Sequence, residues 1–433
     1  MATASTVAVI GGGYAGMAAA VTLAAQNIAV TVFEAGKQPG GRARRVEHRD
    51  TALDNGLHIL SGAYSETLRL IRAVNPQHDT ALLRVPLAWH MHGEFALTAP
   101  RLPAPLHLLA ALLTARGAGC GERLQMVRFL AALKHQSYRL AADCSVEQLL
   151  TEHRQSEFMR RVFWRPLCVA ALNTPPAIAS AQIFVNVLRD TMNASRAASD
   201  LLLARVDLSA LFPEPAAAYV QEHGGKVELG TRVTAISAGA SAFEVATGND
   251  RRSFSHLICA LPPHQVGAFL DGFPLLSDIS AMIAQFDYQP IYSVWLQFAA
   301  PLTLPAPMLG FADGPLHWLF DRGALCGQTG LIGAVISAEG AHQDISQDEL
   351  GALAHAEISR RISGLPALQW LRVIAEKRAT FACTPNLRRP PHVTPLQNFY
   401  LAGDYTAGDY PATIESAVRS GIACAEHIAT RQA

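Results

Sequence analysis

Val7-Ala8-Val9-Ile10-Gly11-Gly12-Gly13-Tyr14-Ala15-Gly16 begins the stretch that decides the fold, and Ile28-Ala29-Val30-Thr31-Val32-Phe33-Glu34 ends it. The first apolar run is short, rich in β-branched residues and stops at glycine, which is typical of a buried parallel strand. An alanine-rich run separates it from the second apolar run. This order predicts a strand, a glycine turn, a helix and a second strand.

The glycines of this turn fit the pattern G-x-G-x-x-G, with Gly11, Gly13 and Gly16 at its three fixed positions. The first glycine allows a tight turn, the second lets a pyrophosphate approach the backbone, and the third lets helix and strand pack closely. The first helical turn, which contains Ala15, then offers free N–H groups to the anion. Glu34 ends the second strand, where an acceptor for ribose hydroxyls is expected. These five residues are predicted to bind a dinucleotide.

Composition excludes some classes of function. The 433 residues carry a formal net charge of zero, so nothing indicates a nucleic-acid partner. Half of the residues are hydrophobic and 16% are charged, which favours an apolar surface or cavity. The seven cysteines contain no C-x-x-C pair, and we interpret them as reduced thiols of a cytoplasmic protein without a metal site or signal peptide.

Two further motifs follow the second strand. Gly40-Gly41-Arg42 brings the backbone close to a ligand and supplies a phosphate-binding cation, and Asp54-Asn55-Gly56-Leu57-His58 comes next. Together with the glycine turn and its acid, these motifs resemble those of the amine oxidase and phytoene desaturase superfamily of FAD enzymes. The resemblance implies an α/β fold with a discontinuous, Rossmann-like FAD domain and an α+β substrate domain of mixed sheet and helices.

The second strong signal lies near the end of the chain, where a strand leads to Gly403-Asp404 and a helix begins near Thr413. The resemblance implies that Asp404 binds the ribityl or pyrophosphate part of FAD and that the helix start, Thr413 and Ile414, points at the flavin. It also implies that Val233 holds the adenine through its backbone. The remaining predicted FAD contacts are Gly40, Gly41, Arg42, Asn55, Gly56 and Gly403.

The chain is accordingly divided into alternating parts. Residues 1–75, 215–275 and 390–433 are predicted to form the FAD domain. Residues 76–214 are predicted to be mostly helical and to face substrate or membrane, and residues 276–389 to form the sheet of the substrate domain. Within that sheet we predict strands at 291–298, 331–337 and 371–379 and a helix at 348–362.

The segment from Leu102 to Thr114 is uncharged but much shorter than the ~20 residues that a membrane-spanning helix needs. An interfacial segment or substrate mouth is favoured over an ordinary core helix. Polar residues also occur inside apolar mid-chain stretches, such as Asn173 and Asn186. An unpaired buried polar group costs roughly 1 to 3 kcal/mol, so each is expected to have a partner.

Two mid-chain stretches, Arg165 to Asp190 and Ala198 to Pro213, resemble the squalene-associated branch of the superfamily, the hydroxysqualene dehydroxylases of hopanoid biosynthesis. This resemblance implies reductive removal of the allylic hydroxyl of hydroxysqualene, giving squalene. It also implies an external electron donor and peripheral contact with the inner face of the cytoplasmic membrane. An acid must protonate the leaving hydroxyl. The candidates are His58, Asp54, Asp409 and Tyr410, each of which is also compatible with a structural role.

Two other functions remain open at this point. A carotenoid-type desaturase would use the same fold on a long isoprenoid chain, and a non-catalytic lipid escort protein would use it without chemistry. An amine oxidase is disfavoured, because Thr413 stands where that family has a tyrosine of its aromatic cage.

Overall fold

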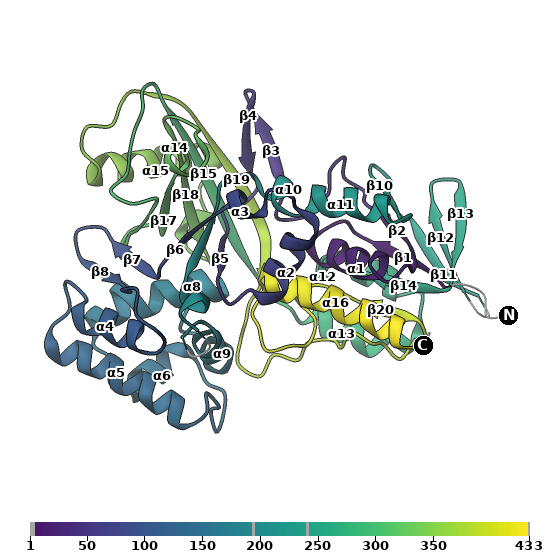
Figure 1. The fold of residues 1–433 in the computed structure, drawn as a ribbon, viewed down its shortest axis with the longest axis horizontal. Helices are drawn as coiled ribbons and strands as arrows, with labels where there is room; N and C mark the ends of the chain where they lie inside the picture. The colour runs from purple at the N-terminus through teal and green to yellow at the C-terminus, as the bar shows by residue number, and fades with distance from the viewer. Residues whose placement is uncertain (1–4, 193–194, 240–241, 432–433) are drawn as a thin grey trace.

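A five-stranded parallel sheet is the centre of the nucleotide-binding part in the computed structural model, which describes residues 5–192, 195–239 and 242–431 (Figure 1). The strand order is β10-β2-β1-β14-β20, and every neighbouring pair is parallel. The strands are β1 (Thr6–Ile10), β2 (Ala29–Phe33), β10 (Lys226–Glu228), β14 (His256–Cys259) and β20 (Phe399–Leu401). They come from three separate parts of the chain, so the predicted discontinuous Rossmann-like domain is confirmed.

One face of this sheet is covered by helices from both chain ends. Val7 and Val9 are buried against α1 (Tyr14–Ala24), and α16 (Ile414–Thr430) packs beside α1 (Figure 1). The two helices approach closely because Gly421 has no side chain: a Cβ atom there would lie 2.1 Å from the Ala15 carbonyl oxygen. The last helix of the chain is thereby fixed against the first.

The other face of the parallel sheet packs on a small antiparallel sheet and two helices. These elements are β11 (Ala235–Ala238), β12 (Phe243–Thr247), β13 (Asp250–Phe254), α12 (Pro263–Leu270) and α13 (Ser277–Ala284). Phe33, at the end of β2, contacts Phe254 edge to face with ring centroids 5.8 Å apart. Both faces of β1 are therefore buried, as expected for its unbroken apolar sequence.

A seven-stranded sheet with the order β19-β15-β18-β17-β16-β7-β8 forms the second part of the molecule (Figure 1). Its strands are β7 (Ala88–Met91), β8 (Phe95–Thr98), β15 (Tyr288–Phe298), β16 (Met308–Gly310), β17 (Trp318–Asp321), β18 (Leu331–Ser337) and β19 (Leu368–Phe381). Helix α15 (Gln347–Arg361) covers one face, where Val294 and Leu296 meet Ala354 and Ile358. The strands and the helix predicted between residues 291 and 379 are confirmed.

Residues 76–214 contain more strand than the sequence predicts. The helices are α3 (His78–Ala81), α4 (Leu106–Thr114), α5 (Cys120–His135), α6 (Val146–Glu152), α7 (Glu157–Met159), the π-helical η1 (Arg160–Trp164), α8 (Arg165–Leu172), α9 (Ala181–Met192), the 3₁₀ turn η2 (Arg196–Ser199), α10 (Leu208–Leu211) and the start of α11 (Pro213–Glu222). Strands β6 (Leu82–Val85), β7, β8 and β9 (Leu201–Ala204) lie among them. Helices still predominate in this segment, as predicted, but the four short strands were not predicted, because four-residue runs carry no clear period and β9 pairs with β6, which is remote in sequence.

Candidate functional site

The glycine turn between β1 and α1, residues 11–16, presents backbone atoms that no large side chain covers. This turn is called the cradle below. Gly11 has φ +106°, and a Cβ atom there would lie 2.8 Å from the Ala260 carbonyl oxygen. A Cβ atom on Gly16 would lie 2.0 Å from the Gly11 carbonyl oxygen. A Cβ atom on Gly13, by contrast, would meet only Gly41, at 3.9 Å. The first and third glycines are thus required by packing, whereas the second leaves space for a ligand.

Helix α1 presents its amino end to this cradle. Its N-cap is Gly13, which has no side chain to accept a hydrogen bond from the first turn, where Ala15 lies. The first N–H groups of a helix have no partner within the helix, and its amino end carries a partial positive charge. The cradle therefore fits the pyrophosphate of a dinucleotide.

Glu34 lies directly beside the cradle, at the carboxyl end of β2. Its carboxylate accepts hydrogen bonds from the Gly12 N–H, at 2.7 Å, and from the Gly36 N–H, at 2.6 Å. The Thr231 N–H donates to the Glu34 carbonyl oxygen, which draws the segment containing the buried Val233 along the same edge. The predicted ribose and adenine contacts are therefore neighbours of the cradle.

The Gly40-Gly41-Arg42 loop crosses the opposite side of the cradle. The Gly40 N–H donates to the Gly12 carbonyl oxygen at 2.8 Å, and Arg42 forms an ion pair with Asp404 at 2.7 Å. The Asn55 side-chain amide donates to the Arg42 carbonyl oxygen at 3.2 Å, and Gly56 follows directly. One loop thus joins the two predicted cofactor motifs from opposite ends of the chain.

Helix α16 begins where the sequence predicts. Thr413 is its N-cap, and the Thr413 hydroxyl accepts a hydrogen bond from the Ser416 N–H at 3.2 Å. Ile414 is the first helical residue. One turn further, Ser420 accepts a hydrogen bond from the Gly403 N–H at 2.7 Å, which fixes the loop before Asp404 to the helix.

Asp54 and His58 line one small cavity of about 10 Å³, the space of a single water molecule. Its other walls are Leu57, Leu203, Ala204, Leu208, Phe320, Arg322 and Leu325. Burial raises the pKa of Asp54 to about 6, although Arg322 at 3.5 Å and the Leu208 N–H at 2.8 Å favour its charged form. Burial lowers the pKa of His58, and its Nδ1 atom lies 2.9 Å from the Gly56 carbonyl oxygen. A weak buried acid, its arginine partner and an imidazole of lowered pKa thus line one small cavity whose other walls are apolar.

The other two acid candidates, Asp409 and Tyr410, lie in a loop with different partners. The Asp409 side chain is 70% exposed and lies 3.8 Å from Arg189. Burial, together with Asp190, raises the pKa of Tyr410 to about 12, and its carbonyl oxygen accepts a hydrogen bond from Arg389 at 2.8 Å. Neither residue lines the cavity of Asp54 and His58.

The mid-chain polar residues are paired as the sequence predicts. The Asn173 side chain donates to the Thr380 hydroxyl at 2.9 Å and accepts from the Ala338 N–H at 2.8 Å. The Asn186 side chain donates to the Asp409 carbonyl oxygen at 3.0 Å. These hydrogen bonds account for the burial of both asparagines in apolar surroundings, and no ligand is needed to explain it.

Some residues of the site give no signal in the sequence. Arg322, the partner of Asp54, begins α14 (Arg322–Cys326) after β17, and Ser420 lies inside a helix. Ala260 limits the space at Gly11 from a third part of the chain. The remote strands β14 and β17 bring Ala260 and Arg322 to the motifs, whereas α16 brings Ser420.

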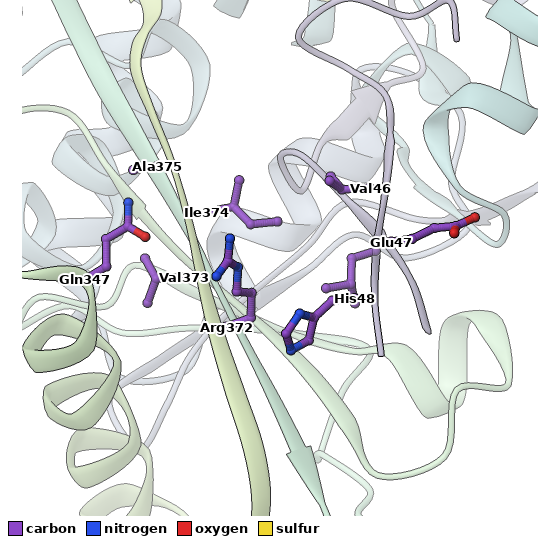
Figure 2. A pocket seen from close by; sticks show the side chains of 9 residues that line it. Val46, Glu47, His48, Gln347, Arg372, Val373, Ile374 and Ala375 are labelled. Carbon is purple, nitrogen blue, oxygen red and sulfur yellow. The ribbon is translucent and has the colours of Figure 1, made fainter. Parts of the chain in front are cut away.

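A separate polar hollow of about 270 Å³ lies between β19 and the ribbon of β3 (Arg45–His48) and β4 (Thr51–Asp54) (Figure 2). Figure 2 shows His48 next to Arg372, while Glu47 points away from them. Burial and the charge of Arg372 lower the pKa of His48. The nine residues that line this hollow come from other segments than the glycine turns, so it is distinct from the nucleotide cradle.

Comparison with known proteins identifies the class. The family model described as "Flavin containing amine oxidoreductase" matches residues 14–429. A putrescine oxidase triple mutant has the same fold, with a TM-score of 0.74 and 16% identity over 99% of both chains. A putative protoporphyrinogen oxidase from Exiguobacterium superimposes with a TM-score of 0.71 and 15% identity over 99% of this chain and 100% of that chain. The protein is therefore an enzyme, a flavin-dependent oxidoreductase.

Relatives found by sequence similarity indicate a narrower family. A hydroxysqualene dehydroxylase of Rhodopseudomonas palustris is 31% identical over 96% of each chain, and one of Sinorhizobium fredii is 29% identical over 95% of each. A 15-cis-phytoene desaturase of Synechococcus elongatus is 24% identical over 98% of this chain and 96% of its own. The chain belongs to the hydroxysqualene dehydroxylase family, within the flavin-containing amine oxidoreductases.

Two observations concern metals and membranes. Among the described residues, no group of three His, Cys, Asp or Glu side chains is arranged to hold a metal ion. Within that same part of the chain, every helix is too short or too polar to cross a membrane.

Proposed function

We propose that the cofactor is FAD and that the enzyme reductively removes the allylic hydroxyl of hydroxysqualene to give squalene. The observation that carries this proposal is the full-length similarity to hydroxysqualene dehydroxylases, combined with an intact dinucleotide cradle beside a large apolar cluster. FAD fits the cradle because both a pyrophosphate site and a ribose acceptor, Glu34, are present at one sheet edge.

The side chains between the seven-stranded sheet and the neighbouring helices form a packed apolar cluster, and we propose that the long isoprenoid chain binds against this part of the molecule. One face of the seven-stranded sheet contributes Trp89, Met91, Met308, Trp318 and Phe320 to it, and the helices opposite contribute Phe163, Trp164 and Phe184. Burying hydrocarbon stabilises a complex by about 0.8 kcal/mol per CH₂ group. Binding therefore requires few polar contacts, and alignment of the reactive carbon is the main task of the site.

Asp54 is the proposed proton donor. Hydroxide is a poor leaving group, so the oxygen has to be protonated as the C–O bond breaks. Asp54 has a pKa of about 6 and lines the cavity, whereas burial keeps His58 neutral and Tyr410 is too weak an acid. An apolar chain beside Asp54 would exclude water and raise its pKa further.

Bound reduced FAD supplies the hydride that replaces the hydroxyl. The overall change consumes two electrons and two protons for each C–O bond broken, with water as the second product. An external electron donor is therefore part of the proposal.

We also propose that α4 touches the membrane from which the substrate comes. Its outer side carries Leu106, Leu109 and Leu113, which are 52%, 40% and 51% exposed. Residues 100–134 contain five Lys and Arg and a single acid, in a chain of zero net charge. Exposed leucines with surrounding cations are typical of contact with an anionic lipid surface.

The test is product analysis under anaerobic conditions. Holoenzyme reduced with dithionite is expected to convert hydroxysqualene into squalene, detected by mass spectrometry, while oxidised holoenzyme is not. The desaturase alternative predicts the opposite: a polyene precursor should bleach the oxidised flavin absorbance. Reduced holoenzyme that forms no squalene would contradict the proposed function.

A further inference from the structure

Ser293 is a buried hydroxyl without a partner. It lies in the middle of β15, is 0% exposed, and its Oγ atom makes no hydrogen bond in the described part of the chain. Its cross-strand neighbours are Val335 on β18 and Ile374 on β19, both apolar. Buried polar groups are nearly always hydrogen-bonded, so a lone hydroxyl in such surroundings calls for an explanation.

Ser293 lies on the face of the sheet against which the segment of Asp54 and His58 packs. Side chains alternate along a strand, and Tyr292 and Val294 pack under α15, so Ser293 faces the opposite side with Ile291 and Trp295. On that side Leu57 rests against the sheet: a Cβ atom on Gly333, the cross-strand partner of Trp295, would lie 2.5 Å from Leu57 Cδ1. Ser293 therefore lies on the face that holds the loop between Asp54 and His58.

A second unpartnered group stands next to it on the same face. The Trp295 Nε1 atom is buried and has no hydrogen-bond partner among the described residues. The Arg322 guanidinium lies over the Trp295 ring, 5.6 Å from its centroid, and pairs with Asp54 at 3.5 Å. Two unsatisfied polar groups thus lie on one sheet face in apolar surroundings, and the second of them adjoins the ion pair of Asp54 and Arg322.

We propose that the Ser293 hydroxyl binds the oxygen of the substrate alcohol and so aligns it with Asp54. This deepens the proposed function and rests on it. The long hydrocarbon binds equally well before and after the reaction, and only the oxygen distinguishes substrate from product. A site that hydrogen-bonds a substrate hydroxyl discriminates strongly against the compound that lacks it, because its own polar group is then left unpaired. Ser293 would thus favour alcohol entry and hydrocarbon release.

The experiment compares Ser293→Ala with a matched variant, Ser180→Ala. Ser180 is also 0% exposed, but its hydroxyl donates to Asp143 at 2.7 Å. Holoenzyme is titrated with hydroxysqualene and with squalene, and binding is followed by the flavin absorbance. Ser293→Ala should weaken alcohol binding at least tenfold with squalene binding unchanged, and its melting temperature should stay or rise. Ser180→Ala should lower the melting temperature and leave the alcohol preference intact.

Each result bears on one proposal only. If Ser293→Ala keeps the wild-type preference for alcohol over hydrocarbon, the inference is wrong even though wild-type turnover supports the proposed function. If Ser293→Ala instead changes flavin affinity or the absorbance maximum and not the preference, the hydroxyl serves the cofactor, and the inference is again overturned. Failure of the wild type to make squalene counts against the proposed function itself.

Discussion

The Arg42 guanidinium lies 2.7 Å from the Asp404 carboxylate, although 362 positions separate the two residues. Asp404 is 5% exposed, so its carboxylate is shielded from water. Arg42 also donates to the Ala379 carbonyl oxygen on β19, which links the loops of the parallel sheet to the seven-stranded sheet. A single side chain thus ties both chain ends and both sheets together next to the nucleotide cradle.

Substituting Asp404 should therefore weaken cofactor binding. Asp404→Ala leaves Arg42 without its partner and removes the predicted contact to the ribityl or pyrophosphate part of FAD. Loss of a buried charged hydrogen bond costs about 2 to 3 kcal/mol, so the affinity should fall by one to two orders of magnitude. Flavin retained after gel filtration, measured at 450 nm, is the readout.

Asp313→Ala is the control for this variant, because the Asp313 side chain is 59% exposed and pairs with Arg161 at a distant surface. It should retain a full complement of flavin. An Asp404→Ala protein that also keeps its flavin would remove Asp404 from the cofactor site.

Gly16→Ala should damage the fold at the cradle. The new Cβ atom would meet the Gly11 carbonyl oxygen at 2.0 Å; the oxygen is a backbone atom and the position of the Cβ atom is fixed by its own backbone, so neither can turn away. Forcing an extra carbon into a packed site costs typically 1 to 3 kcal/mol. A lower melting temperature and loss of flavin are expected.

The matched variant is Gly121→Ala in α5, where a Cβ atom meets nothing within 4 Å. Alanine is favoured over glycine in a helix by up to about 1 kcal/mol, so this variant should be as stable as the wild type or more so. Equal melting temperatures for both variants would show that the third glycine is not required by packing.

The sequence predicts the cradle well because its determinants are local. Gly11, Gly13 and Gly16 act through turn geometry, and the acid that ends β2 is fixed by the length of one strand-helix-strand unit. The place of the β7–β8 hairpin in the seven-stranded sheet could not be predicted, because it depends on pairing with β16, which is remote in sequence. The roles of Arg322 and Ser293 could not be predicted from the sequence either. They depend on the packing of α14, which contains Arg322, and of β15, which contains Ser293, against the segment around Asp54. What remains a prediction is the role of each contact and the division into domains.

Asp54 should make stability fall as pH rises. Its pKa is raised from 3.8 to about 6 in the folded protein, so the folded state binds more protons than the unfolded state between these values. The contribution of Asp54 to the free energy of unfolding is therefore greatest below pH 4 and falls as the pH rises through 6. The change is on the order of 2 to 3 kcal/mol. Asp54→Asn should lack this part of the pH dependence of urea unfolding.

The same titration should limit the reaction if Asp54 donates the proton. Turnover by the wild type should decline above pH 6, whereas Asp54→Asn should be nearly inactive at every pH. Asp79→Asn, whose side chain is 92% exposed, is the control and should follow the wild type in both measurements. A wild-type rate that stays constant from pH 5 to 8 would exclude Asp54 as the donor.

Charges on the outer side of α4 should release the protein from lipid. The double variant Leu106→Glu and Leu113→Glu removes two exposed leucines, each worth about 1.5 to 3 kcal/mol when buried, and adds repulsion from anionic headgroups. Binding to vesicles of phosphatidylglycerol and phosphatidylethanolamine should fall at least tenfold in a sedimentation assay.

Leu353→Glu is the corresponding control, since Leu353 is 42% exposed on α15, an element of the other part of the molecule. It should bind vesicles like the wild type. Unchanged binding of the α4 variant would mean that another surface meets the membrane.

Glu415 should hold the amino end of α16 in position through a second helix. This residue follows Ile414, is 1% exposed, and its carboxylate accepts hydrogen bonds from the Glu66 and Thr67 N–H groups, at 3.1 and 2.9 Å, at the start of α2 (Ser65–Val74). Arg419 adds an ion pair at 2.7 Å. Glu415→Gln keeps the size of the side chain but loses the charge that four donors share, the fourth being the Thr67 hydroxyl, so the free energy of unfolding should fall by about 1.5 to 3 kcal/mol.

A displaced α16 should also alter the cofactor site, because Thr413 and Ile414 begin this helix. We therefore expect Glu415→Gln to lower flavin affinity together with stability, as read by flavin absorbance and by urea unfolding of the same sample. Glu66→Gln is the matched control: its pair with Arg69 lies at the surface, where such pairs contribute about 0 to 1 kcal/mol. If Glu415→Gln loses stability but binds flavin like the wild type, the start of α16 is positioned by its packing on α1 and not by this carboxylate.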